Sequence, residues 1–270
     1  DVYKRQVVGD WDNYYSTMSF DAEAQIVREL GKFLKEGSLY RGFKPVLWST
    51  VEKTALADAE VEYQDHKSDT IYASFPIKSS NIKELNDSEI VIWTTTPWTI
   101  PANKALAYNE SLEYLLIEVN DDGDFKNKKI VVADALIDSV VKDTKIQSFK
   151  KLKNFKGKDL KGTICNHPFL KLGYEYDIPM LEATFVTTEQ GTGIVHCAPS
   201  HGPDDFNLCM NNGIKAIETV DGDGRYTKNV ALFEGIHIFK SNSIVIEKLK
   251  EQKKLLSSGE LVHSYPHSWR

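Results

Sequence analysis

Hydrophobic residues recur at helical spacing near the start of the chain. The apolar residues that share one helical face are Ile26, Val27, Leu30, Phe33 and Leu34. Ser19 or Asp21 provides an N-cap side chain, and Gly37 supplies a stop after the last apolar residue. The pattern predicts one amphipathic helix, followed by a short apolar strand at 44–50 (KPVLWST).

From about residue 69 to residue 200 the pattern changes to short apolar or alternating segments separated by Asn, Asp and Gly. The expected strands are 70–77, 89–95, 112–119, 128–133, 183–188 and 191–198, with a return strand at 261–270. Helices are expected at 133–141, 203–212 and 243–256. Short separations favour a closed or strongly curved sheet over a βαβ series. The predicted fold class is therefore α+β, mainly β, with peripheral helices.

Length and composition describe a globular protein. A chain of 270 residues with 41% hydrophobic content buries a sizeable core. It has no run of about 18 apolar residues and no signal-peptide order at its N-terminus, so we expect a soluble, cytoplasmic protein without membrane contact. Three cysteines without a C-x-x-C pair, Cys165, Cys197 and Cys209, argue against a disulfide framework and a zinc ribbon.

The charge distribution is uneven. A net charge of −6 is unlike that of a nucleic-acid binder, which needs clustered Lys and Arg. Residues 142–161 are the exception, with eight lysines against Asp143 and Asp159. We interpret this segment as a solvated lysine-rich loop, because charge runs usually do no more than solvate a surface.

Two segments are chemically dense. The first, residues 94–103, places three threonines, Pro97, Trp98 and Thr99 where a hairpin needs only a simple turn. The second, GTGIVHCAPSHGPDDF at 191–206, puts His196 near the end of an apolar strand and Asp205 in the first turn of the next helix. A lone strand histidine is usually a packed core residue, and first-turn carboxylates stabilise the helix dipole. The Pro/Gly-rich loop between them, however, is typical of a pocket rim.

Other chemistries fit these residues less well. A Ser200–His201–Asp204 triad is disfavoured, because neighbours in one short loop do not readily align a nucleophile, a base and an orienting acid. A phosphate-cradling Gly-Lys-Ser/Thr loop is absent from the sequence, and DGDGR at 221–225 is a turn rather than a calcium loop. A zinc site has suitable ligand types at spacings that match no common pattern: Cys165, His167, His196, Cys197 and Cys209.

Together the two segments, WTTTPWTIPANKALAYN and GTGIVHCAPSHGPDDF, resemble the threonine-rich and His/Asp motifs of the editing insertion in isoleucyl-tRNA synthetases of class I. The resemblance extends from about Val8 to Arg270, and DVYKRQ at the start fits nothing in it. It implies a β-barrel-like editing domain at 50–260, a flanking piece of the Rossmann-type catalytic domain at 1–49, and a return strand toward that domain at 261–270. Valyl and leucyl relatives typically carry Thr-Thr-Arg-Pro at the turn, so Thr-Thr-Thr-Pro-Trp-Thr favours the isoleucyl branch.

The resemblance implies a reaction, the hydrolysis of the ester that joins a wrong amino acid, valine, to tRNA(Ile). Asp205 is expected to anchor the α-ammonium group, His196 to form the wall that rejects isoleucine, and Trp98 to contact the terminal adenosine. The implied catalytic residues are Thr94, Thr95, Thr96, His196 and Asp205, and the implied substrate-binding residues are Trp98, Thr99, Asn103 and Gly193.

The resemblance also implies the partners and cofactors. The expected partners are the 3′ end of tRNA(Ile) and the remainder of the synthetase chain, and we expect a monomer. No metal or cofactor is expected for these residues, because the ATP and Mg²⁺ signatures of the family lie outside them. Two alternatives stay open: a non-catalytic β-barrel whose lysine segment holds tRNA, and valyl-type editing against threonine.

Overall fold

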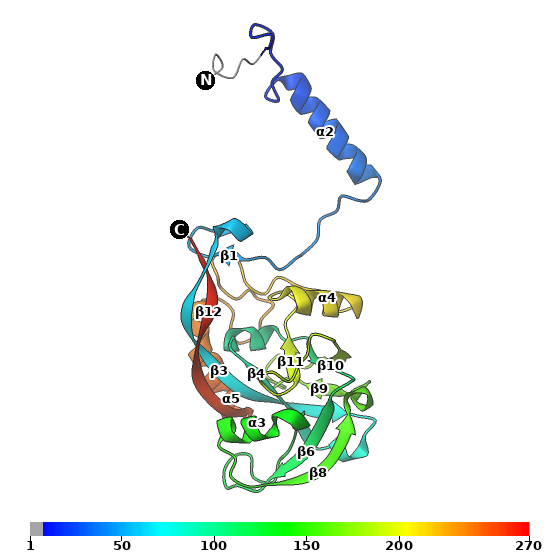
Figure 1. Cartoon of the computed structure of the whole chain (residues 1–270), viewed down its shortest axis with the longest axis vertical. Coiled ribbons are helices and arrows are strands. Elements are labelled where there is room, and N and C mark those ends of the chain that lie inside the picture. Colours follow the sequence, from blue (N-terminus) through cyan, green and yellow to red (C-terminus); the bar gives the residue numbers. More distant parts are fainter. Residues whose placement is uncertain (1–7, 270) are drawn as a thin grey trace. The chain divides into compact units, whose positions relative to one another are not determined.

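A computed structural model describes residues 8–269 of the chain (Figure 1). Contacts between Cα atoms divide it into two compact units, Asp1–Gly42 and Phe43–Arg270. The predicted domain boundaries, 1–49, 50–260 and 261–270, stay predictions, and the DVYKRQ segment lies outside the described residues.

The first unit contains one helix, α2 (Phe20–Lys35). The Ser19 side chain accepts a hydrogen bond from the backbone N–H of Ala22, so Ser19 rather than Asp21 is the N-cap. Gly37 follows with φ +77°, a left-handed conformation that ends the helix as predicted. The apolar face of α2 is exposed to solvent, and the side chains of Ile26, Leu30 and Phe33 are each more than half accessible.

The second unit is built on a ten-stranded mixed sheet, in the order β11-β5-β10-β9-β3-β4-β7-β6-β8, with β12 paired to β3. Its strands are β3 (Val61–Ser79), β4 (Ser88–Thr94), β5 (Ala105–Tyr108), β6 (Glu113–Val119), β7 (Lys129–Ala133), β8 (Phe149–Lys156), β9 (Ile164–Asn166), β10 (Asp177–Glu182), β11 (Ile194–Cys197) and β12 (Leu255–Ser268). Two pairs, β10 with β5 and β4 with β7, are parallel. The mainly β class is confirmed. Within residues 8–269 no hydrogen bonds join the two edges β11 and β8, so the sheet is not a closed barrel.

Short helices and a small hairpin complete the unit. The hairpin pairs β1 (Trp48–Ser49) with β2 (Thr54–Ala55). The helices are α3 (Ile137–Thr144), α4 (Pro203–Asn211) and α5 (Ser241–Glu251), and the 3-10 turns are η1 (Asp58–Glu60), η2 (Lys83–Leu85), η3 (Pro97–Ala102), η4 (Asp134–Leu136), η5 (Gly157–Leu160) and η6 (Ile238–Lys240). The core gathers buried residues of β3, β4, β6 and β7, such as Ile71, Ile90, Leu115 and Val131.

Several predicted elements differ in length from the observed ones, and one predicted strand does not form. Of the strand expected at 44–50, only Trp48 and Ser49 pair with another strand. The strand expected at 183–188 does not form, because the N–H of Val186 bonds to the carbonyl of Ala183 and closes a turn that buries Val186. The last helix is shorter than expected and the return strand longer, because Lys253 adopts φ +54° and the chain turns into β12 at Leu255.

The lysine-rich segment is also not a loop. Residues 149–156 form the edge strand β8, whose Phe155 is buried and whose lysines point to solvent or to carboxylates. In register, Lys150 lies opposite Glu118 and Lys156 opposite Glu113 on β6. Lys153 Nζ lies 2.6 Å from Glu84 Oε1. Neighbouring acidic groups therefore offset much of the positive charge of the strand.

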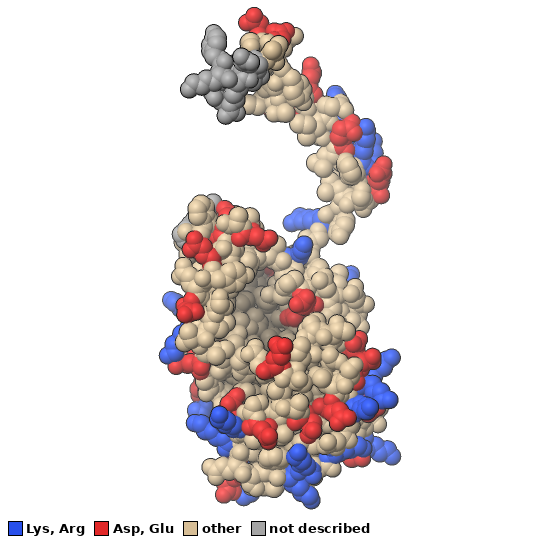
Figure 2. All heavy atoms as spheres, in the orientation of Figure 1, with Lys and Arg blue, Asp and Glu red and all other residues tan. Residues whose placement is uncertain are grey.

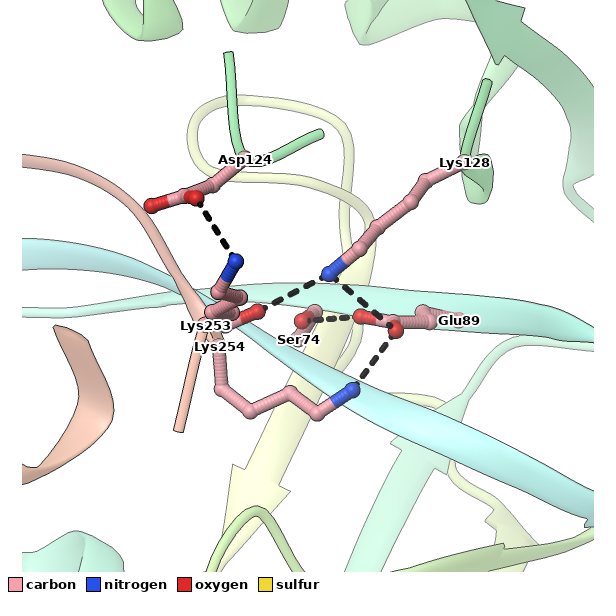
Figure 3. Close-up of polar contacts among 6 residues, drawn as sticks. All are labelled: Ser74, Glu89, Asp124, Lys128, Lys253 and Lys254. Atoms are coloured by element: carbon pink, nitrogen blue, oxygen red, sulfur yellow. Dashed lines mark hydrogen bonds and ion pairs between the residues drawn. The ribbon is translucent and has the colours of Figure 1, made fainter. Parts of the chain in front are cut away.

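A half-buried ionic cluster fastens the turn between α5 and β12 to the sheet (Figure 3). Glu89 on β4 accepts a hydrogen bond from Ser74 and lies 2.6 Å from Lys254 Nζ. Lys128, before β7, donates to the carbonyl of Lys253 at 3.0 Å and lies 3.7 Å from the same carboxylate. Burial lowers the pKa of Lys128. The cluster therefore ties the turn at Lys253 and Lys254 to β4 and to the residue before β7.

Candidate functional site

The three consecutive threonines form the bend between β4 and η3. Thr94 is the last residue of β4, and its Oγ1 accepts a hydrogen bond from the backbone N–H of Thr96 at 3.1 Å. The hydroxyls of Thr94 and Thr96 lie 3.1 Å apart. The hydroxyl of Thr95 makes no hydrogen bond within residues 8–269, and its side chain is half-buried. Two hydroxyls thus stabilise the bend, and the one between them is free for another partner.

The two dense segments meet at His196 on β11. Its Nε2 lies 2.8 Å from Thr99 Oγ1, and its Nδ1 lies 3.3 Å from Asn103 Nδ2. Asn103 Nδ2 also donates to the carbonyl of Ala105 at 2.9 Å, which sets the orientation of the amide. His196 Nδ1 is therefore the acceptor, and Nε2–H donates to Thr99, whose own hydroxyl donates to the carbonyl of Thr96. These hydrogen bonds bring residues of the two motifs together at His196.

His196 is buried and uncharged in this arrangement. Burial, with a smaller contribution from His201, lowers the pKa of His196 to about 4. Both ring nitrogens are occupied by Thr99 and Asn103, so the imidazole is held rigidly. Such a group forms a fixed wall and is a poor general base. This geometry suits the steric role implied by the resemblance.

Asp205 lies in the first turn of α4, at the end of the loop that follows β11. Its Oδ2 accepts a hydrogen bond from the N–H of Ala198 at 2.8 Å. Burial raises the pKa of the carboxyl to about 6, because desolvation outweighs that hydrogen bond. No lysine, arginine or histidine among residues 8–269 forms an ion pair with it. It is a half-buried carboxylate without a cationic partner among these residues.

Trp98 joins the loop after β11 to η3. Its ring meets the His201 ring edge-on, with centroids 4.7 Å apart. His201 Nε2 in turn lies 2.8 Å from Thr219 Oγ1, and burial lowers the pKa of His201 to about 4. The hydroxyl of Ser200 donates to the carbonyl of Ile217 at 2.6 Å and not to His201. The disfavoured Ser200–His201–Asp204 triad therefore lacks its bond between nucleophile and base. The sequence analysis considered His201 only for a triad and did not predict its contacts with Trp98 and Thr219, because nothing in the sequence pairs these residues.

Gly193 has a packing role. It adopts φ +72°, and a Cβ atom at this position would lie 2.4 Å from the Cβ of Ala133. Its carbonyl accepts a hydrogen bond from the Tyr114 hydroxyl at 2.8 Å. These contacts account for glycine at this position by close approach of two segments. Its substrate-binding role stays a prediction.

The site lies in the larger unit, whose surface is visibly hollowed beside the long β3–β12 ribbon and lined there mostly by uncharged atoms (Figure 2). Acidic groups stand along its edge. Two further hollows, of about 590 and 710 Å³, lie elsewhere, beside Asn120–Lys126 and beside Asn81–Glu84. Neither contains a residue of the two motifs.

The residues considered for zinc are used internally. His167 donates from Nε2 to the carbonyl of Ile100 at 3.0 Å, and its Nδ1 accepts from the N–H of Phe169. Cys165, Cys197 and Cys209 are buried free thiols, and burial raises the pKa of each. Over residues 8–269, no group of three or more His, Cys, Asp or Glu side chains is placed to hold a metal ion.

Comparison with known proteins identifies the family. The profile described as "tRNA synthetases class I (I, L, M and V)" matches residues 3–252. The chain therefore belongs to the class I tRNA synthetase family.

Within that family its relatives are isoleucine–tRNA ligases. The ligase of Pelagibacter ubique (strain HTCC1062) is 80% identical over 275 residues, which cover 100% of this chain and 30% of the relative. The ligase of Gluconobacter oxydans (strain 621H) is 47% identical and covers 98% of this chain and 29% of the relative. The predicted resemblance to isoleucyl-tRNA synthetases is confirmed, and the chain spans about a third of the length of these relatives.

A solved structure shares the fold. The one described as "The crystal structure of GlLeuRS-CP1" superposes with a TM-score of 0.53 at 14% identity, over 69% of this chain and 97% of that chain. This likeness confirms the expected fold of the editing insertion.

No helix among the described residues is long and apolar enough to cross a membrane.

Proposed function

We propose that the site formed by the threonine bend, His196 and Asp205 hydrolyses valine from mischarged tRNA(Ile). The observation that carries this proposal is the hydrogen bond between Thr99 and His196, because it unites the two motifs. Asp205 follows in the second motif as a half-buried carboxylate with no cationic partner among residues 8–269. The whole protein, of which this chain is a part, is proposed to ligate isoleucine to tRNA with ATP and Mg²⁺ at a site outside these residues.

The physical need for such a site is clear. One methylene group in a hydrophobic pocket is worth about 1–3 kcal/mol, and isoleucyl-tRNA synthetases are the usual example of this limit. A second site that admits valine and rejects isoleucine supplies the missing discrimination by size. His196, packed and held at both nitrogens, is a wall that does not yield to an extra methylene.

The chain's own groups bind and orient the ester. Asp205 pairs with the α-ammonium of the misattached amino acid, as a charge-assisted contact. The Thr95 hydroxyl and the backbone of the bend hold the terminal ribose and a water molecule, and Trp98 contacts the adenosine end. The water oxygen attacks the carbonyl carbon, the ester C–O bond breaks, and the ribose oxygen takes up a proton. The neighbouring free ribose hydroxyl assists the attack, and no metal is required.

The proposal is tested with the 270-residue chain, tRNA(Ile) charged with valine, and the Asp205→Ala variant. We expect the parent chain to release valine and Asp205→Ala to release it at least tenfold more slowly, since an ammonium anchor is lost. Circular dichroism checks that the variant is folded. Release at the parent rate by a folded Asp205→Ala chain contradicts the assigned role.

A further inference from the structure

The backbone of Trp98 is held by side chains from outside its own loop. At the start of η3, Pro97 has no N–H and the N–H of Thr99 bonds to Thr96, so the N–H of Trp98 is a donor that the turn itself leaves unsatisfied. Asn242 Oδ1 accepts it at 3.1 Å from a position 144 residues later in the chain. The hydroxyl of Tyr226 donates to the Trp98 carbonyl. The N–H and the carbonyl of Trp98 are thus both hydrogen-bonded by side chains that lie far away in the sequence.

Asn242 is itself held in place. Its Nδ2 donates to Asp69 Oδ2 at 2.9 Å. Asp69 lies on β3 where the strand passes from exposed residues 62–67 to the buried Ser68 and the core segment beyond. The position therefore requires a side chain that accepts from Trp98 and donates to Asp69 at the same time. Asparagine does both, whereas a carboxylate would face the carboxylate of Asp69.

We propose that Asn242 is a positioning residue for the threonine bend, with Asp69 orienting its amide. Among the described residues the hydrogen bonds of Asn242 go to Trp98 and Asp69 and not to His196 or Asp205, so it acts through the backbone of Trp98, between Thr96 and Thr99. A displaced Trp98 shifts the hydroxyl that bonds His196 and the bend that holds the ribose. The inference rests on the proposed hydrolysis, because it assigns Asn242 to that reaction.

A reciprocal exchange of side chains tests this assignment. Asn242→Asp still accepts from Trp98 but sets two carboxylates against each other. In the double variant Asn242→Asp/Asp69→Asn the amide at position 69 donates to the carboxylate at position 242, so the hydrogen bond is restored in the reverse direction. We expect Asn242→Asp to lower kcat for valyl-tRNA(Ile) by roughly 10- to 100-fold, with little change in KM, because misplacement of about 1 Å costs that much. The double variant should recover to within about threefold of the parent, and Asp69→Asn alone should lose no more than that.

The control and a second readout keep the outcomes distinct. Asn154→Asp on the exposed face of β8 adds the same charge and should leave kcat unchanged. Hydrogen–deuterium exchange of the segment 94–103 should be faster in Asn242→Asp and return to the parent rate in the double variant. Parent-like kcat and exchange in Asn242→Asp, or a double variant as slow as Asn242→Asp, overturns the assignment. A parent chain that releases no valine contradicts the proposed function, and the exchange pattern then decides alone whether Asn242 positions the bend.

Discussion

At the residue scale, the threonines of the bend divide into two kinds. Thr94, Thr96 and Thr99 use their hydroxyls within the protein, whereas the Thr95 hydroxyl has no partner among residues 8–269. This division separates structural from chemical roles in a way that the sequence alone does not allow. It predicts opposite consequences for two substitutions that look alike.

Thr95→Ala should leave the free energy of unfolding within about 0.5 kcal/mol of the parent, because no hydrogen bond is lost. Valine release should fall at least tenfold. Thr99→Ala removes the partner of buried His196 Nε2–H and should lower the free energy of unfolding by about 1–3 kcal/mol. Urea denaturation and release kinetics on the same samples check both. An unstable Thr95→Ala, or a stable Thr99→Ala, contradicts this division of roles.

One proton on Asp205 is expected to affect both stability and valine release. Burial raises the pKa of its carboxyl from 3.8 to about 6, so the folded state binds this proton more tightly than the unfolded state. Its contribution to the free energy of unfolding is complete below about pH 4 and is lost as the pH rises to about 6. Asp205→Asn keeps the bond from Ala198 and removes the buried charge. The variant should therefore be about 1–3 kcal/mol more stable than the parent at pH 7.5 and no more stable at pH 4.

The same variant should lose valine release at every pH, and release by the parent should decline as the pH falls below about 6 and the anchor is neutralised. Denaturation curves at pH 4 and 7.5, with a pH–rate profile, check these outcomes. A variant less stable than the parent at pH 7.5 contradicts the cost assigned to the buried charge.

At the element scale, alternation predicted some strands and missed others for physical reasons. The segments 89–95 and 128–133 are apolar and buried, and β4 and β7 form close to where they were expected. Half of the residues of β8 are lysines, and its strand state comes from pairing with β6 and burial of Phe155, which no local pattern reveals. Conversely, the run at 183–188 forms a turn, which is closed by the hydrogen bond from the N–H of Val186 to the carbonyl of Ala183.

The charge balance of β8 bears on the tRNA-binding alternative. Lys153 is paired with Glu84, and Glu118 and Glu113 lie opposite Lys150 and Lys156 in register. We therefore expect these lysines to contribute little to binding of a phosphate backbone. A triple variant, Lys150→Ser with Lys153→Ser and Lys156→Ser, should change KM for valyl-tRNA(Ile) by less than about threefold at 0.15 M salt. Filter binding and release kinetics check this. A much larger rise in KM would return the lysine segment to the tRNA interface.

The ionic cluster of Figure 3 predicts where the α5–β12 turn is vulnerable. Glu89 is 12% exposed and faces two lysines, so Glu89→Ala leaves half-buried ammonium groups without their carboxylate. We expect a loss of about 2–4 kcal/mol in the free energy of unfolding. The matched control is Lys78→Ala, whose pair with Asp177 is half exposed and should contribute less than about 1 kcal/mol. Similar losses in both variants, measured by urea denaturation, contradict the importance of burial.

At the scale of the whole molecule, the sequence placed two distant motifs in one site but not the framework that supports them. His196 and Asp205 stood out by residue type, strand end and helix start. Asn242, Tyr226 and His201 did not, because their roles depend on contacts across 18 to 144 residues of chain. The curved, open sheet that brings them together follows from strand pairings that have no local signature.

The proposed function requires that the site of His196 discriminate between amino acids by size. The most direct measurement is amino acid release by the 270-residue chain from tRNA(Ile) charged in turn with valine, threonine and isoleucine. We predict rapid release of valine and at least tenfold slower release of isoleucine, since one methylene must be rejected by the wall. Equal release of valine and isoleucine, release of threonine alone, or no release of valine would contradict the account.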